Sequence, residues 1–286
     1  MSLEYWYLFP ISVAIATTAM ASGIGGAVFF SPLFIIALKL DPSVAIGTAL
    51  VTELFGFSSG VWAYWRRRLI DYRVGMMLLC FSLPLAIVGS TNADALSPNL
   101  LKGAFGVGVM FIGLQMYQAY KREHRDSSQE QETDAASVTS EHESVLVDRD
   151  GREYRYTICH KSEASAFAAL GGLFLGMISV GLAELEEYHL VVRCRIPPPV
   201  AVGTSVFVVV VTVLIASAGH FHNFATNSDP AVLQQVLAVV TFTIPGVIVG
   251  GQIGPFLQTK LDPGHVKLGL SILFTGVGIF MLSTLG

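Results

Sequence analysis

The chain has 286 residues, of which 52% are hydrophobic and only 13% are charged, and its mean hydropathy is +0.61. About 25% of the residues in a soluble domain are charged, so this composition excludes a soluble globular protein and indicates a multi-pass membrane protein. The net charge of −4 hides a local concentration, because residues 121–163 hold 7 of the 17 Lys and Arg and 11 of the 21 Asp and Glu. We therefore expect two membrane repeats, 1–120 and 164–286, joined by a polar loop at 121–163.

The first apolar stretch, residues 7–38, is too long for one straight membrane span. A helix over this range would be about 48 Å long at 1.5 Å per residue, whereas the hydrocarbon core is about 30 Å thick. Gly23, Gly25, Gly26 and Pro32 interrupt the stretch. We expect a broken helix or a re-entrant hairpin that turns at the glycines, because lipid tolerates irregular backbone only where protein or water surrounds it.

Three uninterrupted spans follow, at about 44–64, 74–91 and 99–119. Residues 121–144 are polar and poor in aromatic residues, which predicts a disordered segment. Beyond them, two alternating segments flank Asp148–Gly151, a turn sequence, and this pattern predicts a small β-hairpin.

The second half repeats the order of the first. It begins with an interrupted segment, about 164–196, and continues with spans at about 199–219, 231–256 and 265–285. The sequence VAIGTALV around Thr48 recurs as VAVGTSVF around Thr204. The chain is therefore a duplication with about eight hydrophobic segments in total, and we expect an all-α membrane fold.

The distribution of Lys and Arg predicts that the two halves are inverted. Three corresponding connections reverse their Lys and Arg content between the halves, and cytoplasmic loops are the ones enriched in these residues. The predicted cytoplasmic connections are Arg66–Arg73, 121–163, Arg193–Arg195 and Lys260–Lys267. The predicted external ones are Thr91–Pro98 and His220–Pro230.

Several of these motifs together resemble the TauE/SafE family of anion permeases. The resemblance rests on Ser22–Gly26 with Pro32, Val44–Thr48, Leu83–Gly89, Gly172–Gly181, Val200–Ser205 and Ile244–Gly250. The resemblance covers nearly the whole chain except the polar loop. The sequence departs from the family pattern at Gly181–Tyr188, where many family members have a glycine-rich turn. The resemblance implies a secondary permease for a small anion, sulfite or an organosulfonate, working in export.

Broken helices offer a physical reason for anion binding. Helix starts expose unpaired backbone N–H groups, and the helix dipole favours negative charge there, while Thr and Ser hydroxyls add donors. The candidate substrate-binding residues are Ser22, Gly23, Gly25, Gly26, Gly47, Thr48, Gly203, Thr204 and Ser205. The competing interpretation is that the small residues serve close helix packing.

Acidic residues supply candidates for proton coupling. Glu53 is the only acid well inside a regular span, and intramembrane carboxylates are usually functional; the alternative is a structural carboxyl bonded to a neighbouring helix. Glu184 and Glu187 share a helical face and are further candidates. For Glu184, Glu186 and Glu187 together, the sequence favours a solvated turn at the membrane surface.

The sequence predicts neither a cofactor nor a metal site, and no enzyme motif is present. Cys80, Cys159 and Cys194 are too few and too scattered for a disulfide framework or a metal site. His220 and His222 are expected in an ordinary external loop. The alternatives to anion permeation are transport of another small solute or metal ion, and a membrane scaffold or sensor acting through the polar loop. Bacterial inner membrane is the expected location, and the oligomeric state is open.

Overall fold

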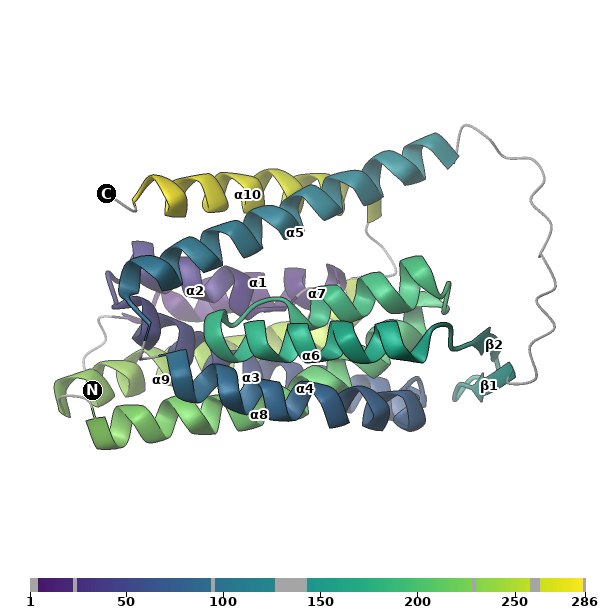
Figure 1. Cartoon of the computed structure of the whole chain (residues 1–286), viewed down its shortest axis with the longest axis horizontal. Coiled ribbons are helices and arrows are strands. Elements are labelled where there is room, and N and C mark those ends of the chain that lie inside the picture. Colours follow the sequence, from purple (N-terminus) through teal and green to yellow (C-terminus); the bar gives the residue numbers. More distant parts are fainter. Residues whose placement is uncertain are drawn as a thin grey trace.

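The computed structural model describes residues 5–22, 25–93, 96–126, 143–227, 230–257 and 263–284, and its helices lie side by side along one long axis (Figure 1). The helices of the first half are α1 (Leu8–Ser22), α2 (Ala27–Ile36), α3 (Pro42–Arg67), α4 (Tyr72–Asn92) and α5 (Pro98–Asp126). The break between α1 and α2 agrees with the predicted interruption.

The remaining elements are β1 (Glu143–Val147), β2 (Glu153–Thr157), α6 (Lys161–Ile178), α7 (Leu182–Glu187), the π-helix η3 (Tyr188–Arg193), α8 (Pro198–Asn227), α9 (Pro230–Leu257) and α10 (Pro263–Ser283). Among the described residues, five of these helices (α3, α4, α5, α8 and α9) are long and apolar enough to cross a membrane, and three shorter apolar helical segments accompany them. The disorder predicted for residues 121–144 is wrong at its two ends, because 121–126 belong to α5 and 143–144 belong to β1; residues 127–142 lie outside the described residues.

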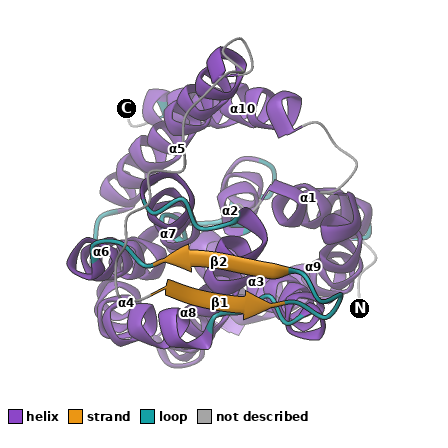
Figure 2. Cartoon of the chain, turned by 90° about the vertical axis from the view of Figure 1, so that its right-hand side faces the viewer, coloured by secondary structure: helices purple, strands orange, loops and turns teal. Residues whose placement is uncertain are grey.

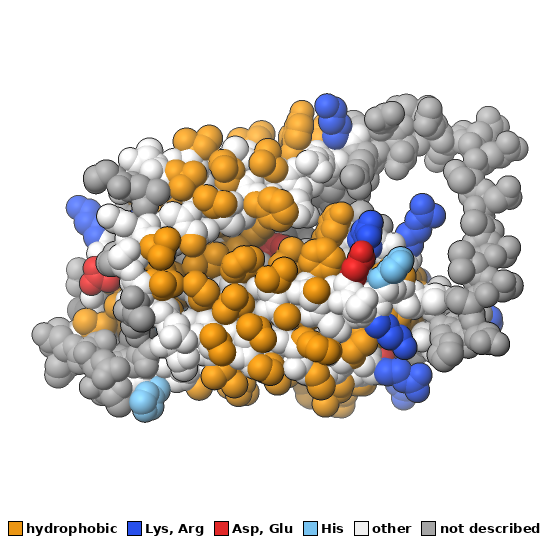
Figure 3. Space-filling model, in the orientation of Figure 1, with side chains coloured by type: hydrophobic (Ala, Val, Ile, Leu, Met, Phe, Trp, Pro, Cys, Tyr) orange, Lys and Arg blue, Asp and Glu red, His pale blue; other side chains and the backbone are white. Residues whose placement is uncertain are grey.

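The visible surface has the pattern of a membrane protein. Hydrophobic side chains cover the middle of the bundle, and Lys and Arg gather mainly at the end that carries the hairpin (Figure 3). Trp62 and Trp65, near the end of α3, are 54% and 52% exposed, as expected for aromatic side chains at a membrane interface. The chain is an all-helical multi-pass membrane protein apart from its hairpin.

Local sequence explains where α3 and α4 begin and end. Pro42 starts α3, where its missing N–H costs nothing. Arg68 ends that helix in the left-handed conformation at φ 57°. Asp71 then caps α4, since its Oδ1 accepts from the backbone N–H groups of Arg73 (2.9 Å) and Val74 (3.2 Å). A tight, charged connection therefore joins the two spans.

Packing between the halves is reciprocal. Helix α1 packs along α9, and its counterpart α6 packs along α4, while α5 packs along α10. Glycines allow these close approaches: a Cβ on Gly172 or Gly176 of α6 would meet the backbone of Ser82 or Ala86 in α4. Small residues at such positions are typical of membrane helix interfaces. Each half therefore completes its core with helices of the other.

The equivalent helices α3 and α8 run in opposite directions. Near the start of α8, Thr204 Oγ1 accepts a hydrogen bond of 3.0 Å from the backbone N–H of Asp71, just beyond the end of α3. Near the other end of α8, a Cβ on Gly219 would lie 2.8 Å from Oγ of Ser90, close to the end of α4. The two helices that carry the repeated Gly-Thr pair thus begin at opposite ends of the bundle.

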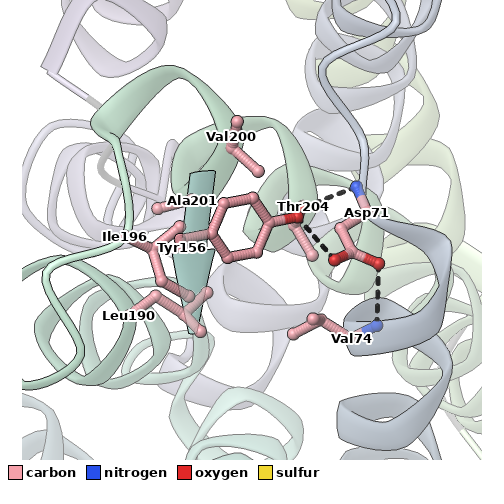
Figure 4. Close-up of a pocket in the computed structure, with 8 residues that line it drawn as sticks. All are labelled: Asp71, Val74, Tyr156, Leu190, Ile196, Val200, Ala201 and Thr204. Carbon is pink, nitrogen blue, oxygen red and sulfur yellow. Dashed lines mark hydrogen bonds between the residues drawn. The ribbon is translucent and has the colours of Figure 1, made fainter. Parts of the chain in front are cut away.

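The predicted β-hairpin is confirmed, and it lies across one end of the bundle (Figure 2). Its strands pair antiparallel, with Val147 opposite Glu153. The backbone N–H of Arg149 donates to the carbonyl of Arg67 (3.1 Å). Tyr156 donates its hydroxyl to Oδ2 of Asp71 (2.6 Å), and its ring reaches across a small pocket to that carboxylate (Figure 4). The hairpin is therefore fixed to the α3–α4 connection.

The expectation that the cysteines form no disulfide is wrong. Cys159, which follows β2, is bonded to Cys194, which follows η3, and their Cα atoms are 5.3 Å apart. Folding brings together two residues that are 35 apart in sequence. Cys80 remains a free thiol in α4.

Removing the Tyr156 hydroxyl should loosen the hairpin. A hydrogen bond to a charged group contributes about 1.5–3 kcal/mol, so Tyr156→Phe should speed amide hydrogen exchange in β1 and β2. Tyr154→Phe is the matched control, because the Tyr154 hydroxyl donates to Asp148 within the hairpin itself (3.3 Å). Equal exchange in both variants would contradict the docking role.

The same contact should respond to alkali. Burial, and then the hydrogen bond to Asp71, raise the pKa of the Tyr156 phenol. A raised pKa means that the phenol's contribution is complete below the unfolded pKa of about 10 and is lost as the pH rises through the folded pKa. Hairpin exchange, corrected for the intrinsic pH effect, should therefore stay constant at neutral pH and increase only in strongly alkaline solution.

Candidate functional site

The interruptions of the two halves meet inside the bundle. The first lies between α1 and α2, and the second lies between α6 and α7, where Ser179 and Gly181 have φ of 58° and 114°. The hydroxyls of Ser31 in α2 and Ser179 lie 2.7 Å apart, and both side chains are buried. Two segments about 150 residues apart in sequence thus form one polar junction.

A glutamate from each half occupies the backbone N–H groups at this junction. Oε1 of Glu53, in α3, accepts from the N–H of Ala27 at the start of α2 (3.1 Å). Oε1 of Glu184, in α7, accepts from the N–H of Gly25 (3.2 Å), and its Oε2 accepts from the N–H of Gly181 (3.0 Å). Glu184 therefore joins the two breaks.

The two carboxylates converge on Gly25. A Cβ at this position would lie 3.2 Å from Oε1 of Glu53 and 3.3 Å from Oε1 of Glu184. A methyl group here would push both oxygens back by a few tenths of an ångström, so the glycine favours close approach of the two carboxylates to the backbone. This is a specific reason for one of the glycines in the first interruption.

A third carboxylate lies on the same short helix. Oε2 of Glu186 accepts from the hydroxyl of Ser205 in α8 (3.0 Å), and Glu186 is only 1% exposed. Oε2 of Glu53 and Oε1 of Glu186 are buried and have no hydrogen-bond partner in the part of the chain that the structure describes. Unpaired buried carboxylate oxygens are costly, which indicates groups that bind a proton or another ligand.

The geometry has a direct chemical meaning. Backbone N–H groups at the start of α2 are donors suited to an oxyanion, and in this structure carboxylate oxygens accept from them. A carboxylate that is protonated loses its charge and is a weaker acceptor, so the N–H groups become available to another anion. A link between proton binding and anion binding at this site stays a prediction.

The structure brings together only part of the predicted site. Gly25 and Gly26 lie at the start of α2 beside Glu53, and Glu184 joins them. Ser22 ends α1, and Gly23 lies outside the described residues. Glu187 is the last residue of α7. The proton-coupling role of Glu53, Glu184 and Glu187 stays a prediction.

The two Gly-Thr pairs do not meet. Thr48 Oγ1 donates to the Val44 carbonyl of its own helix (2.7 Å). Thr204, at the opposite end of the bundle, accepts from Asp71 N–H. Gly47 is buried in α3, and a Cβ on Gly203 would lie 2.7 Å from the Leu69 carbonyl. Both pairs lie in packed surroundings, and their substrate contacts stay a prediction.

Two interpretations from the sequence are wrong. The Glu184–Glu187 run is not a solvated surface turn, because Glu186 is buried and Glu184 bonds the two helix breaks. His220 is not in an external loop, because it lies within α8, is fully buried, and its Nε2 is 3.0 Å from the Gly176 carbonyl. For His220, the apolar residues that precede it in the sequence were the available signal.

Comparison with known proteins supports a transport function. The profile of the family described as "Sulfite exporter TauE/SafE" matches residues 8–281. The chain belongs to the TauE/SafE family. It is 23% identical over 286 residues to "Probable membrane transporter protein YunE" of Bacillus subtilis (strain 168), with 96% of each chain covered. It is 25% identical over 264 residues to "Probable membrane transporter protein YjnA" of the same organism, covering 90% of this chain and 92% of the relative.

No solved structure matches. The TauE/SafE match covers nearly all of the chain, including both helix breaks and the carboxylates that join them. The protein is therefore a multi-pass membrane transporter of this family and not an enzyme. The central junction is a place where the helix breaks and carboxylates of both halves meet inside the bundle.

Proposed function

We propose that the protein is a secondary transporter of a small sulfur oxyanion, sulfite or an organosulfonate, and that anion movement is coupled to protons at the central junction. The observation that carries this proposal is the bridge made by Glu184 between Gly25 N–H and Gly181 N–H. A carboxylate and a sulfite or sulfonate group offer the same charged oxygen acceptors to backbone N–H groups. Glu184 thus acts as a stand-in for the anion when no anion is bound.

Proton binding by Glu53 and Glu184 is the proposed coupling step. With both carboxylates ionised, an entering anion meets two negative charges beside Gly25, and like charges at such distances repel strongly in a low-dielectric site. Protonation of one carboxylate weakens that repulsion and frees an N–H group at the first helix break. An anion and a proton therefore enter the junction together.

Inverted repeats are the proposed basis of alternating access. The proposal is supported by the opposite directions of α3 and α8 and by the reciprocal packing of α1 on α9 and α6 on α4. Transporters with inverted repeats place substrate between broken helices near the bilayer midplane. Tilting of one half against the other would open the junction to each side in turn.

The orientation follows from the charged end of the bundle. Arg66–Arg68, Arg193 and the hairpin lie at one end, which we assign to the cytoplasm of a bacterial inner membrane. The membrane potential, negative on the cytoplasmic side, favours outward movement of negative charge by about 2.3 kcal/mol per elementary charge per 100 mV. A divalent anion that moves with one proton still carries net negative charge, so this potential favours export.

Flux measurements in proteoliposomes test the proposed substrate. Purified protein should carry labelled sulfite at a saturable rate, and small organosulfonates should compete with it. Chloride at the same concentration should compete poorly, because it lacks the oxygen acceptors that replace those of Glu184. Absence of saturable flux for every sulfur oxyanion tested would exclude this substrate class.

A further inference from the structure

Three side chains that commonly bind metals gather at the hairpin end of the bundle, away from the transport junction. Cys159 follows β2, His189 lies in η3, and Cys194 follows η3. Their two sulfur atoms and one imidazole nitrogen all lie within 4.8 Å of one another. The Sγ atom of Cys194 is 3.3 Å from Nε2 of His189. The proposed transport mechanism uses none of the three.

The imidazole is buried and directed at the sulfurs. His189 is 1% exposed, and Nδ1 of its ring has no hydrogen-bond partner within the described ranges. The Phe167 ring packs against it with centroids 5.6 Å apart, which fixes its orientation. Arg193, at the end of η3, is paired with Glu163 at 2.9 Å, so its charge is compensated locally. Nε2 of His189 therefore lies against the Cys194 sulfur, and the Cys159 sulfur belongs to the same group of atoms within 4.8 Å.

We propose that Cys159, His189 and Cys194 form, in the reduced protein, a binding site for a thiophilic cation of the Zn²⁺ class. Two thiolates and one imidazole suit Zn²⁺, whereas Mg²⁺ and Ca²⁺ prefer oxygen ligands. Three protein ligands leave the fourth tetrahedral position for water. The orientation assigned above places the site in the cytoplasm, where glutathione and other thiols keep cysteines reduced.

Metal binding requires reduction of the bond between Cys159 and Cys194. Two glutathione molecules supply two electrons and two protons, the S–S bond breaks, two thiols form, and the glutathione is oxidised to its disulfide. The cation then displaces both thiol protons and accepts a lone pair from neutral His189. The oxidised protein offers no thiolate, so it cannot hold the cation.

The position of the site gives the cation a structural role. Cys159 lies two residues beyond β2, whose Tyr156 docks on Asp71, and Cys194 lies in the connection that leads into α8. A cation bound to both would tie the hairpin to the start of α8 in the reduced protein, as the disulfide does in the oxidised one.

Cobalt titration of the full-length protein in detergent tests the proposal. After reduction with a phosphine, which competes weakly for metal, the protein should bind one equivalent of Co²⁺ with thiolate-to-cobalt charge-transfer absorption, and Zn²⁺ should bleach it. Cys159→Ser and Cys194→Ser should lose this absorption. His189→Ala should weaken binding at least about tenfold, since loss of even an outer partner of a metal site costs 10–100-fold.

Cys80→Ser is the matched control, because Cys80 is the remaining cysteine and lies in α4; it should bind Co²⁺ as the wild type does. The unreduced wild type carries no substitution, so a folding defect cannot explain its result, and it should show no charge-transfer absorption. Reduced protein without such absorption would overturn the proposal. So would absorption that survives in both Cys159→Ser and Cys194→Ser. These results do not depend on anion flux, so they are independent of the transport proposal.

Discussion

Glu53→Gln should abolish the part of anion flux that a pH gradient drives. Glutamine has nearly the same shape, and its side-chain oxygen can still accept from the Ala27 N–H that Glu53 binds at 3.1 Å. It cannot take up or release a proton. The variant should therefore fold and reach the membrane, yet its flux should no longer change when a pH gradient is imposed.

Glu163→Gln is the matched control for this substitution. Glu163 lies in the first turn of α6 and pairs with Arg193 near the hairpin end, where its side chain is 40% exposed. An exposed ion pair contributes only about 0–1 kcal/mol, so this variant should keep full coupling. Wild-type coupling in Glu53→Gln would exclude Glu53 as the proton carrier.

Gly172→Ala should destabilise the bundle. The new methyl group would meet backbone atoms of Ser82, with the Ser82 Cα only 2.8 Å away, and backbone cannot move aside as a flexible side chain can. Overpacking of this kind costs about 1–3 kcal/mol. A lower thermal midpoint in detergent and a lower yield of folded protein should follow.

Gly276→Ala separates this steric effect from the general effect of replacing a glycine. Nothing lies within 4 Å of a Cβ at Gly276 in α10, and alanine favours a helix over glycine by about 1 kcal/mol. This variant should be as stable as the wild type or slightly more stable. Equal thermal midpoints for Gly172→Ala and Gly276→Ala would contradict the α4–α6 packing.

The regular elements could be predicted from the sequence because they depend on local pattern. The span expected at 74–91 is α4, Tyr72–Asn92, and its ends follow from polar connections that lipid would not accept. The hairpin around Asp148–Gly151 was likewise visible as alternation on either side of a turn. Both signals lie within a few residues of the element that they predict.

The central junction could be predicted only in part. The glycine interruption around Gly25 and the isolated acid Glu53 are visible in the sequence, but the bond from Gly25 N–H to Glu184 joins residues 159 apart. Nothing in the Glu184–Glu187 run says whether the turn is solvated or buried between helices. That distinction depends on the packing of the second half against the first.

The two Gly-Thr pairs repeat in the sequence but lie apart in the structure. Thr48 and Thr204 occupy equivalent positions near the starts of α3 and α8, and these helices begin at opposite ends of the bundle. Equivalent residues in antiparallel helices meet only near the middle of their length. The two threonines therefore lie apart in this structure, and their substrate contacts stay a prediction.

Proton movement that accompanies the anion is the most direct test of the account. Proteoliposomes that contain a trapped pH indicator should be given an outward sulfite gradient with no initial pH gradient. The protein should carry protons out with the anion, so the lumen should become more alkaline. After correction for passive leak of the uncharged acid, the rate of this pH change should saturate with sulfite and should vanish in Glu53→Gln. Saturable sulfite flux without any protein-dependent change in luminal pH would contradict coupling at the junction of the two broken helices.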